Sequence, residues 1–183
     1  MPPDLIIDIF KYYARFVPKS VLEKIFVQPA ASRLTGYDMI RAEVLAQPTA
    51  REIPGIDAYI VSINENFVSE RIRNAAGFIL FVEYGVLSVD HTVTEGVQQS
   101  LAVSVVRNFS DANSDNLNEI ILMNRCLVML DTILQAMNDE QNELDFCDGS
   151  LVAWPVKTEP VDPALFYGCG GWVAKFKKIN TVL

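Results

Sequence analysis

The most constraining feature of the sequence is an apolar stripe in the segment Asn116 to Asn138. Apolar residues recur there at alternating steps of three and four, the spacing of one face of an α-helix. They are Ile120, Met123, Leu127, Leu130, Leu134 and Met137. Apolar neighbours on both flanks make the stripe wider than the seam of a coiled coil. We therefore expect a long helix that packs across a β-sheet, with Ser114 or Asp115 capping its start.

Two runs rich in β-branched and aromatic residues precede this helix. The first extends from Gly77 to Val89 and the second from Gln98 to Phe109, and both have the composition of strands. The polar connector between them, Asp90 to Gly96, is too long for a two-residue turn. The sequence thus predicts a long antiparallel hairpin whose tip projects from the domain.

The remaining elements complete an α+β fold. Further strands are expected at Asp57 to Ile63, Leu151 to Lys157 and Trp172 to Ile179, and amphipathic helices between Asp4 and Gln28. We expect a mostly antiparallel sheet with a long hairpin, packed by one major amphipathic helix, plus N-terminal helices. Residues 1–55 read as a helical segment punctuated by prolines, and residues 56–183 as the α+β domain.

Charge and composition exclude several classes of partner. The 183 residues include 23 acidic and 15 basic side chains, a formal net charge of -8, which disfavours binding to nucleic acids and anionic lipids. No apolar run approaches the roughly 20 residues of a membrane-spanning helix, and no secretory signal is recognisable. Cys126, Cys147 and Cys169 lack paired spacing, so we expect reduced thiols.

No group of residues predicts catalysis. His91 is the only histidine, and it falls at the hairpin tip, which is a poor place for a catalytic pair. The acidic segment after Asn138 lacks the glycine and glutamate positions of a calcium loop. We expect Glu83 to pair with one of the C-terminal lysines across the sheet rather than to act as a base. The sequence therefore predicts no catalytic, cofactor-binding or metal-binding residue, and no enzyme.

The order of these elements resembles the tail terminator, or head-to-tail joining, proteins among the tail-completion proteins of tailed bacteriophages. The resemblance covers roughly Asp57 to Ile179. It is carried by the segments Phe81-Val82-Glu83-Tyr84-Gly85, Leu101 to Val106, Leu117 to Met137 and Gly168-Cys169-Gly170-Gly171-Trp172. It implies a structural virion protein, made in the bacterial cytoplasm. It also implies a homomeric ring, typically hexameric, at the tail end or neck, in contact with the tail tube or a neck protein.

Two segments are candidates for contacts between subunits. The arm from Val86 to Gln99 is longer than one sheet needs, and the N-terminal segment is rich in aromatic residues. The residues expected to make these contacts are Phe10, Tyr13, Phe16, Val93 and Val97. A small-ligand or peptide-binding module of a bacterial α+β protein is the alternative, and an enzyme with an unrecognised site is a third possibility.

Overall fold

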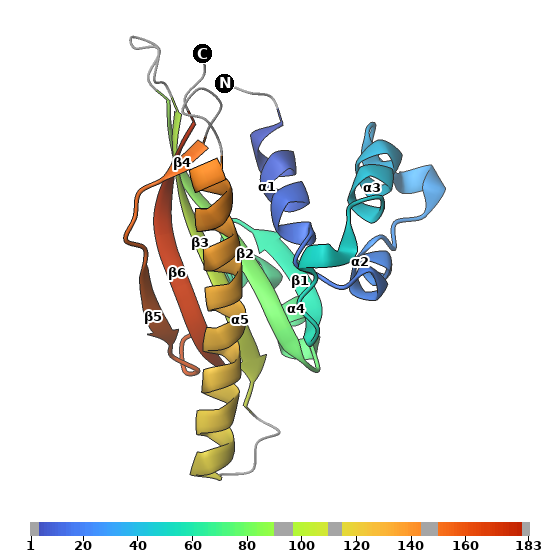
Figure 1. The fold of residues 1–183 in the computed structure, drawn as a ribbon. Coiled ribbons are helices and arrows are strands. Elements are labelled where there is room, and N and C mark those ends of the chain that lie inside the picture. The colour runs from blue at the N-terminus through green and yellow to red at the C-terminus, as the bar shows by residue number, and fades with distance from the viewer. Residues whose placement is uncertain (1–3, 90–96, 110–114, 144–149, 181–183) are drawn as a thin grey trace.

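The computed structural model describes residues 4–89, 97–109, 115–143 and 150–180. The fold is α+β, as expected, with one long helix on a mostly antiparallel sheet (Figure 1). The predicted hairpin tip, with His91 and Val93, lies outside the described residues, as does Cys147.

One mixed sheet forms the centre of the molecule. Its strands are β1 (Ile56–Ser62), β2 (Phe78–Val89), β3 (Val97–Asn108), β4 (Ser150–Val152), β5 (Lys157–Val161) and β6 (Cys169–Asn180). Their order is β1-β2-β3-β6-β4, and β5 pairs with the same edge of β6. Strands β1 and β2 are parallel, and all other pairs are antiparallel. The long hairpin of β2 and β3 is confirmed.

Helices α1, α2, α3 and α5 lie on one face of this sheet, and the short helix α4 packs against the other. Helix α5 (Asn116–Glu143) lies along β3 and β6, and α1 (Leu5–Ala14) lies beside it (Figure 1). Helix α2 (Lys19–Ile25) packs on β1, and α3 (Tyr37–Leu45) contacts α1 and α2. The short helix α4 (Ser69–Asn74) connects β1 to β2 together with the turn at Asn66–Val68.

The first 55 residues share the core of the sheet. Ile9, Phe16 and Leu22 pack with β2, β3 and α5 residues in one buried cluster. Arg51 and Arg15 both form ion pairs with Glu140 of α5. The expected boundary at residue 55 therefore separates segments of one hydrophobic core.

Alternation along the strands divides the sheet into two faces, because successive side chains point to opposite sides. Leu80 and Val82 point toward α5, whereas Ile79 and Phe81 point to the other face. A second, smaller cluster covers only part of that other face. It consists of Ile60, Val68, Ile72, Ile79, Phe81, Val106, Phe166 and Cys169.

Two predicted elements differ in detail. The single strand expected at Leu151 to Lys157 is instead the end of β4, a break and the start of β5. Pro155 lies in this break and has no backbone hydrogen to donate to a ladder. Helix α5 continues to Glu143, five residues beyond the expected end, so Asp139 and Glu140 are helical rather than part of an acidic loop.

The buried face of α5 is rotated from the predicted stripe. The deeply buried residues are Leu122, Cys126, Leu130, Ile133, Leu134 and Met137, whereas Ile120 is exposed and Leu127 only half-buried. Apolar residues occupy more than one side of this helix, so their spacing alone does not determine which side faces the sheet.

Candidate functional site

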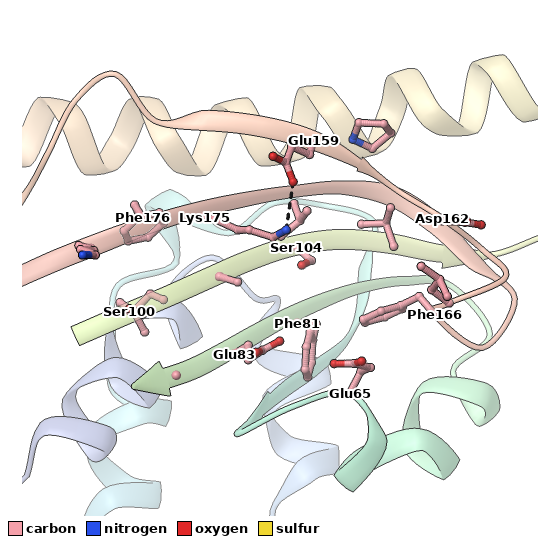
Figure 2. Close-up of a pocket in the computed structure, with 18 of the residues that line it drawn as sticks. Glu65, Phe81, Glu83, Ser100, Ser104, Glu159, Asp162, Phe166, Lys175 and Phe176 are labelled. Atoms are coloured by element: carbon pink, nitrogen blue, oxygen red, sulfur yellow. Dashed lines mark hydrogen bonds and ion pairs between the residues drawn. The ribbon is translucent and has the colours of Figure 1, made fainter. Parts of the chain in front are cut away.

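A groove crosses the face of the sheet opposite α5. It has a volume of about 860 Å³ and is bordered by residues of β2, β3, β5 and β6 and of the segment that joins β5 to β6. Figure 2 shows Phe81 and Phe166 together at one end, with ring centroids 5.5 Å apart. The smaller cluster of the second face thus closes this end, and the rest of the face is open.

Small side chains keep the floor of the groove low. Ser100, Ala102 and Ser104 of β3 line it, while Leu101 and Val103 between them are buried against the opposite face. Period-two alternation of small and branched residues therefore shapes the groove. Because these side chains are short, they leave open space above the groove face of β3 for a bound molecule.

Charges of both signs border the groove. The register places Glu83 opposite Ala102 and Ala102 opposite Lys175, so the three residues form one row across β2, β3 and β6. Lys175 Nζ lies 3.0 Å from Glu159 Oε2 on β5 (Figure 2). Lys175, one of the C-terminal lysines expected to pair with Glu83, thus forms its ion pair with Glu159, because β5 lies directly beside β6.

The surroundings of Glu83 disfavour the ionised form of its carboxyl group. Burial is the main cause that raises its pKa, and the negative charge of Glu65 raises it further. The positive charge of Lys175 opposes this shift. Glu65 and Glu83 thus lie on one side of the groove, and the other side carries both signs of charge, Lys175 and Lys177 with Glu159 and Asp162.

The chemistry of the groove suits binding. It offers apolar surface beside hydroxyl groups and both signs of charge, which are the features of surfaces that recognise peptides and proteins. Within the described part of the chain, no group of three or more His, Cys, Asp or Glu side chains could hold a metal ion.

A second unusual surface lies on the outward side of α5. Four large apolar side chains are exposed there: Leu117 by 63%, Ile120 by 56%, Ile121 by 43% and Val128 by 57%. At about 100° per residue, Leu117, Ile121 and Val128 fall on one line opposite the buried face. We call these four residues the outer apolar row. The start of α5, which carries three of them, extends past the end of the sheet (Figure 1).

Helix α5 also meets a length and composition test for a membrane span. Residues Asn116–Asn142 contain a window of mean hydropathy 1.5, of which 33% is buried in the protein. The expectation that no segment is long and apolar enough is therefore wrong by this criterion. A core helix of a soluble protein passes the same test, and Leu130 and Ile133 are fully buried against the sheet.

The predicted contact residues of the N-terminal segment are placed differently. Tyr13 and Phe16 are 2% and 1% exposed, so the prediction that they contact another subunit is wrong. The spacing Leu5, Ile9, Tyr13 directs this side of α1 into the core. Phe10 is half-buried and stacks on Tyr59 with centroids 5.4 Å apart. It too packs within the chain.

The described structure does not test the two hairpin residues expected to make contacts. Val97 begins β3, where its backbone pairs with Val89 and Asn180, and Val93 lies in the undescribed tip. Sequence reasoning missed both the groove and the outer apolar row. The alternation Ser100, Ala102, Ser104 and the adjacent apolar pairs Ile120-Ile121 and Leu127-Val128 were the available signals.

No model of a known protein family matches the sequence, and no curated protein or solved structure matches it. The groove and the outer apolar row are the features from which a function can be inferred.

Proposed function

We propose that this chain is a structural assembly subunit that packs against further copies of itself in a ring. The observation that carries the proposal is the outer apolar row of α5. Single exposed apolar residues are common, but four on the same side of one helix favour an interaction surface. Burying a large apolar side chain contributes about 1.5–3 kcal/mol, so covering this row favours association.

The place of this ring is proposed from the resemblance to tail terminator proteins. A long hairpin, a long helix and a closing strand follow one another in the order that supported this resemblance. We place the subunit at the tail end or the head-to-tail neck of a phage or phage-like particle, against the tail tube or a neck protein. Its role there is structural and not enzymatic. The net charge of -8 suits a channel through which DNA passes without binding.

Sedimentation velocity of surface variants tests the proposal. Ile121→Glu and Val128→Glu each place a charge in the outer apolar row, and should shift the wild-type oligomer toward monomer. Leu34→Glu is the matched control, because Leu34 is 85% exposed and lies far from α5 in the sequence. Assembly of both row variants at wild-type concentration would contradict the proposal, provided that their circular dichroism is that of the wild type.

The groove supports a second candidate function, a small-ligand or peptide-binding module. Its volume of about 860 Å³ is within the usual range of ligand pockets. Replacing Ala102 by Trp would fill the floor. A compound or peptide from a defined library that stabilises wild type but not Ala102→Trp against heat would favour this function, if the wild type is also monomeric. No stabilisation by any library member would count against it.

A further inference from the structure

We propose that the groove binds an extended peptide segment of a partner protein, with an apolar, a basic and an acidic or polar side chain at successive alternate positions. The inference rests on the second candidate function, ligand binding in the groove, and names the ligand. Three features of the groove carry it: an excess of acidic charge, a buried hydroxyl group and the spacing of the side chains across the strands.

The lining of the groove has an excess of acidic charge. Four carboxylates and two lysines are among its described residues, and Lys175 already pairs with Glu159. Within the described part of the chain, neither Glu65 nor Glu83 has a basic side chain at ion-pair distance. Burial and the negative charge of Glu65 raise the pKa of Glu83, and the charge of Lys175 offsets only part of this shift. A cationic group bound here would stabilise both carboxylates, because an opposite charge at short distance favours the ionised form.

A buried hydroxyl group also faces the groove. Ser104 is 3% exposed and lines the groove (Figure 2), whereas its neighbours Val103 and Val105 point toward α5. Its side chain forms no hydrogen bond with another described residue. Buried polar groups in proteins nearly always have a hydrogen-bond partner. A backbone amide or carbonyl group of a bound peptide would supply one.

The side chains that face the groove form three rows across the strands. The rows are Phe81 with Ser104 and Val173, then Glu83 with Ala102 and Lys175, then Ser100 with Lys177. The first row is apolar at both ends, the second has its unpaired charge on β2, and the third has a lysine on β6. Neighbouring rows are two residues apart along each strand, which is about 6.8 Å.

An extended peptide has the same period as these rows, since its alternate side chains are also about 6.8 Å apart. A peptide that runs along β3 can therefore place residues i, i+2 and i+4 over three successive rows. An apolar side chain would lie over the first row and contact Phe81 and Phe166. A basic side chain would then reach Glu83, and an acidic or polar side chain would reach Lys177.

The mixture of charges favours a peptide over a free polyamine. Lys177 lies one row from Glu83, so a ligand with positive charges along its whole length would meet a like charge there. A peptide can present one basic group to Glu83 and an acidic group or a backbone carbonyl to Lys177. Its apolar side chain would also cover the ring pair that closes one end of the groove.

Selection from a displayed library of random heptapeptides tests the ligand directly. The wild type is the bait, and Ala102→Trp, which fills the floor of the groove, is screened in parallel. We expect the wild type to enrich peptides with an apolar, a basic and an acidic or polar residue at i, i+2 and i+4, in either chain direction. Enriched peptides without a basic residue, or the same enrichment by Ala102→Trp, would contradict the proposal.

Charge changes at Glu83 test its contact with the basic side chain. Glu83→Gln should weaken binding of a selected peptide by about tenfold at low ionic strength, because it removes a hydrogen bond between charged groups. Glu83→Lys should instead prefer the same peptide with glutamate in place of its basic residue. Glu23→Gln is the matched control, since Glu23 is an exposed glutamate of α2 on the other face. Equal affinities of Glu83→Gln and the wild type would refute the contact.

Failure of the inference differs from failure of ligand binding in the groove. Peptides that bind the wild type but not Ala102→Trp, with no preference for a basic residue, would overturn the peptide chemistry and leave ligand binding in place. Spermidine binding as tight as that of the selected peptides, and weakened by Glu83→Gln, would overturn the peptide in favour of a free amine. Peptide binding by Val128→Glu but not by the wild type would assign the groove to a second copy. If neither peptides nor spermidine bind, both proposals for the groove are wrong.

Discussion

Tyr59 of β1 donates its hydroxyl hydrogen to the backbone oxygen of Phe10 in α1, at 2.7 Å, and the two aromatic rings stack. One residue of the sheet thus holds the N-terminal helix by a hydrogen bond and by ring contact. This relationship explains why the aromatic residue Phe10 packs within the chain, and it leaves the exposed apolar residues of α5 rather than α1 as the candidate assembly surface.

The buried side of α5 should be sensitive to truncation at Leu130. Replacing this fully buried residue by Ala should lower the free energy of unfolding by about 2–5 kcal/mol, because a cavity forms where apolar contacts were. Val128→Ala, on the outward side of the same helix, should change it by at most about 0.5 kcal/mol in the monomer. Urea unfolding at low protein concentration measures both. Equal losses in the two variants would show that the assigned faces are wrong.

Glu140 should be important for joining the N-terminal segment to α5. Its carboxylate forms ion pairs with Arg15 and with Arg51, the latter at 2.7 Å. Glu140→Gln keeps the size of the side chain but removes the charge, and should cost about 1.5–3 kcal/mol, as for hydrogen bonds to charged groups. Glu159→Gln is the control, because its ion pair with Lys175 is exposed and should contribute little. Thermal unfolding that ranks Glu159→Gln as the more damaging change would refute this.

The protein should lose stability in alkaline solution. Burial raises the pKa of Tyr13 and Tyr59 well above the usual value and that of Cys126 to about 12. These groups ionise near pH 8.5–10 when unfolded. Stability is therefore full below about pH 8 and falls as the pH rises, because the unfolded chain releases protons that the folded chain keeps.

Replacing Tyr13 by Phe isolates one contribution to this pH dependence. The hydroxyl of Tyr13 makes a long hydrogen bond to the sulfur of Met137, at 3.7 Å, and Phe keeps the ring and its packing. The free energy of unfolding of Tyr13→Phe should fall less steeply than that of the wild type between pH 8 and pH 11. Identical slopes in urea titrations across this range would argue against burial of an un-ionised Tyr13.

Glu83 should reduce stability at neutral pH. Its pKa in the folded state is raised, so stability falls as the pH rises from the unfolded value of about 4.3 through the folded value. Glu83→Gln removes this loss, and its melting temperature in the monomer should exceed that of the wild type at pH 7 but not at pH 3. A variant that is less stable at pH 7 would mean that the carboxylate has a favourable partner within the subunit.

The sequence predicted the positions of helices and strands better than it predicted which side of each helix is buried. The hairpin followed from β-branched runs on either side of a polar connector, and α5 from its helical spacing, because both signals are local. The burial of Tyr13 and Phe16 depends on how α1 meets the sheet, and the rotation of α5 depends on which apolar side is covered. The buried side of each helix is decided by tertiary packing, and hydrophobic periodicity does not predict it when apolar residues occupy several sides of the helix.

The candidate site was less predictable, because it forms from residues that are distant in the sequence. Glu83, Ala102 and Lys175 become neighbours only through the register of three strands, and the pairing of Lys175 with Glu159 requires β5 to lie outside β6. The predicted strand, Leu151 to Lys157, ends where β5 begins, so the sequence did not place Glu159 in a strand beside β6. The placement of the charged residues around the groove could not be assigned from composition.

Native mass spectrometry of the wild-type chain over a range of concentrations, with Val128→Glu measured in parallel, tests most directly whether this protein is an assembly subunit. We predict one closed oligomer of defined stoichiometry, with a six-subunit ring as the expectation from the resemblance, and its loss to monomer in Val128→Glu. A wild type that is monomeric at every concentration, alone and with tail components, would contradict the proposed assembly.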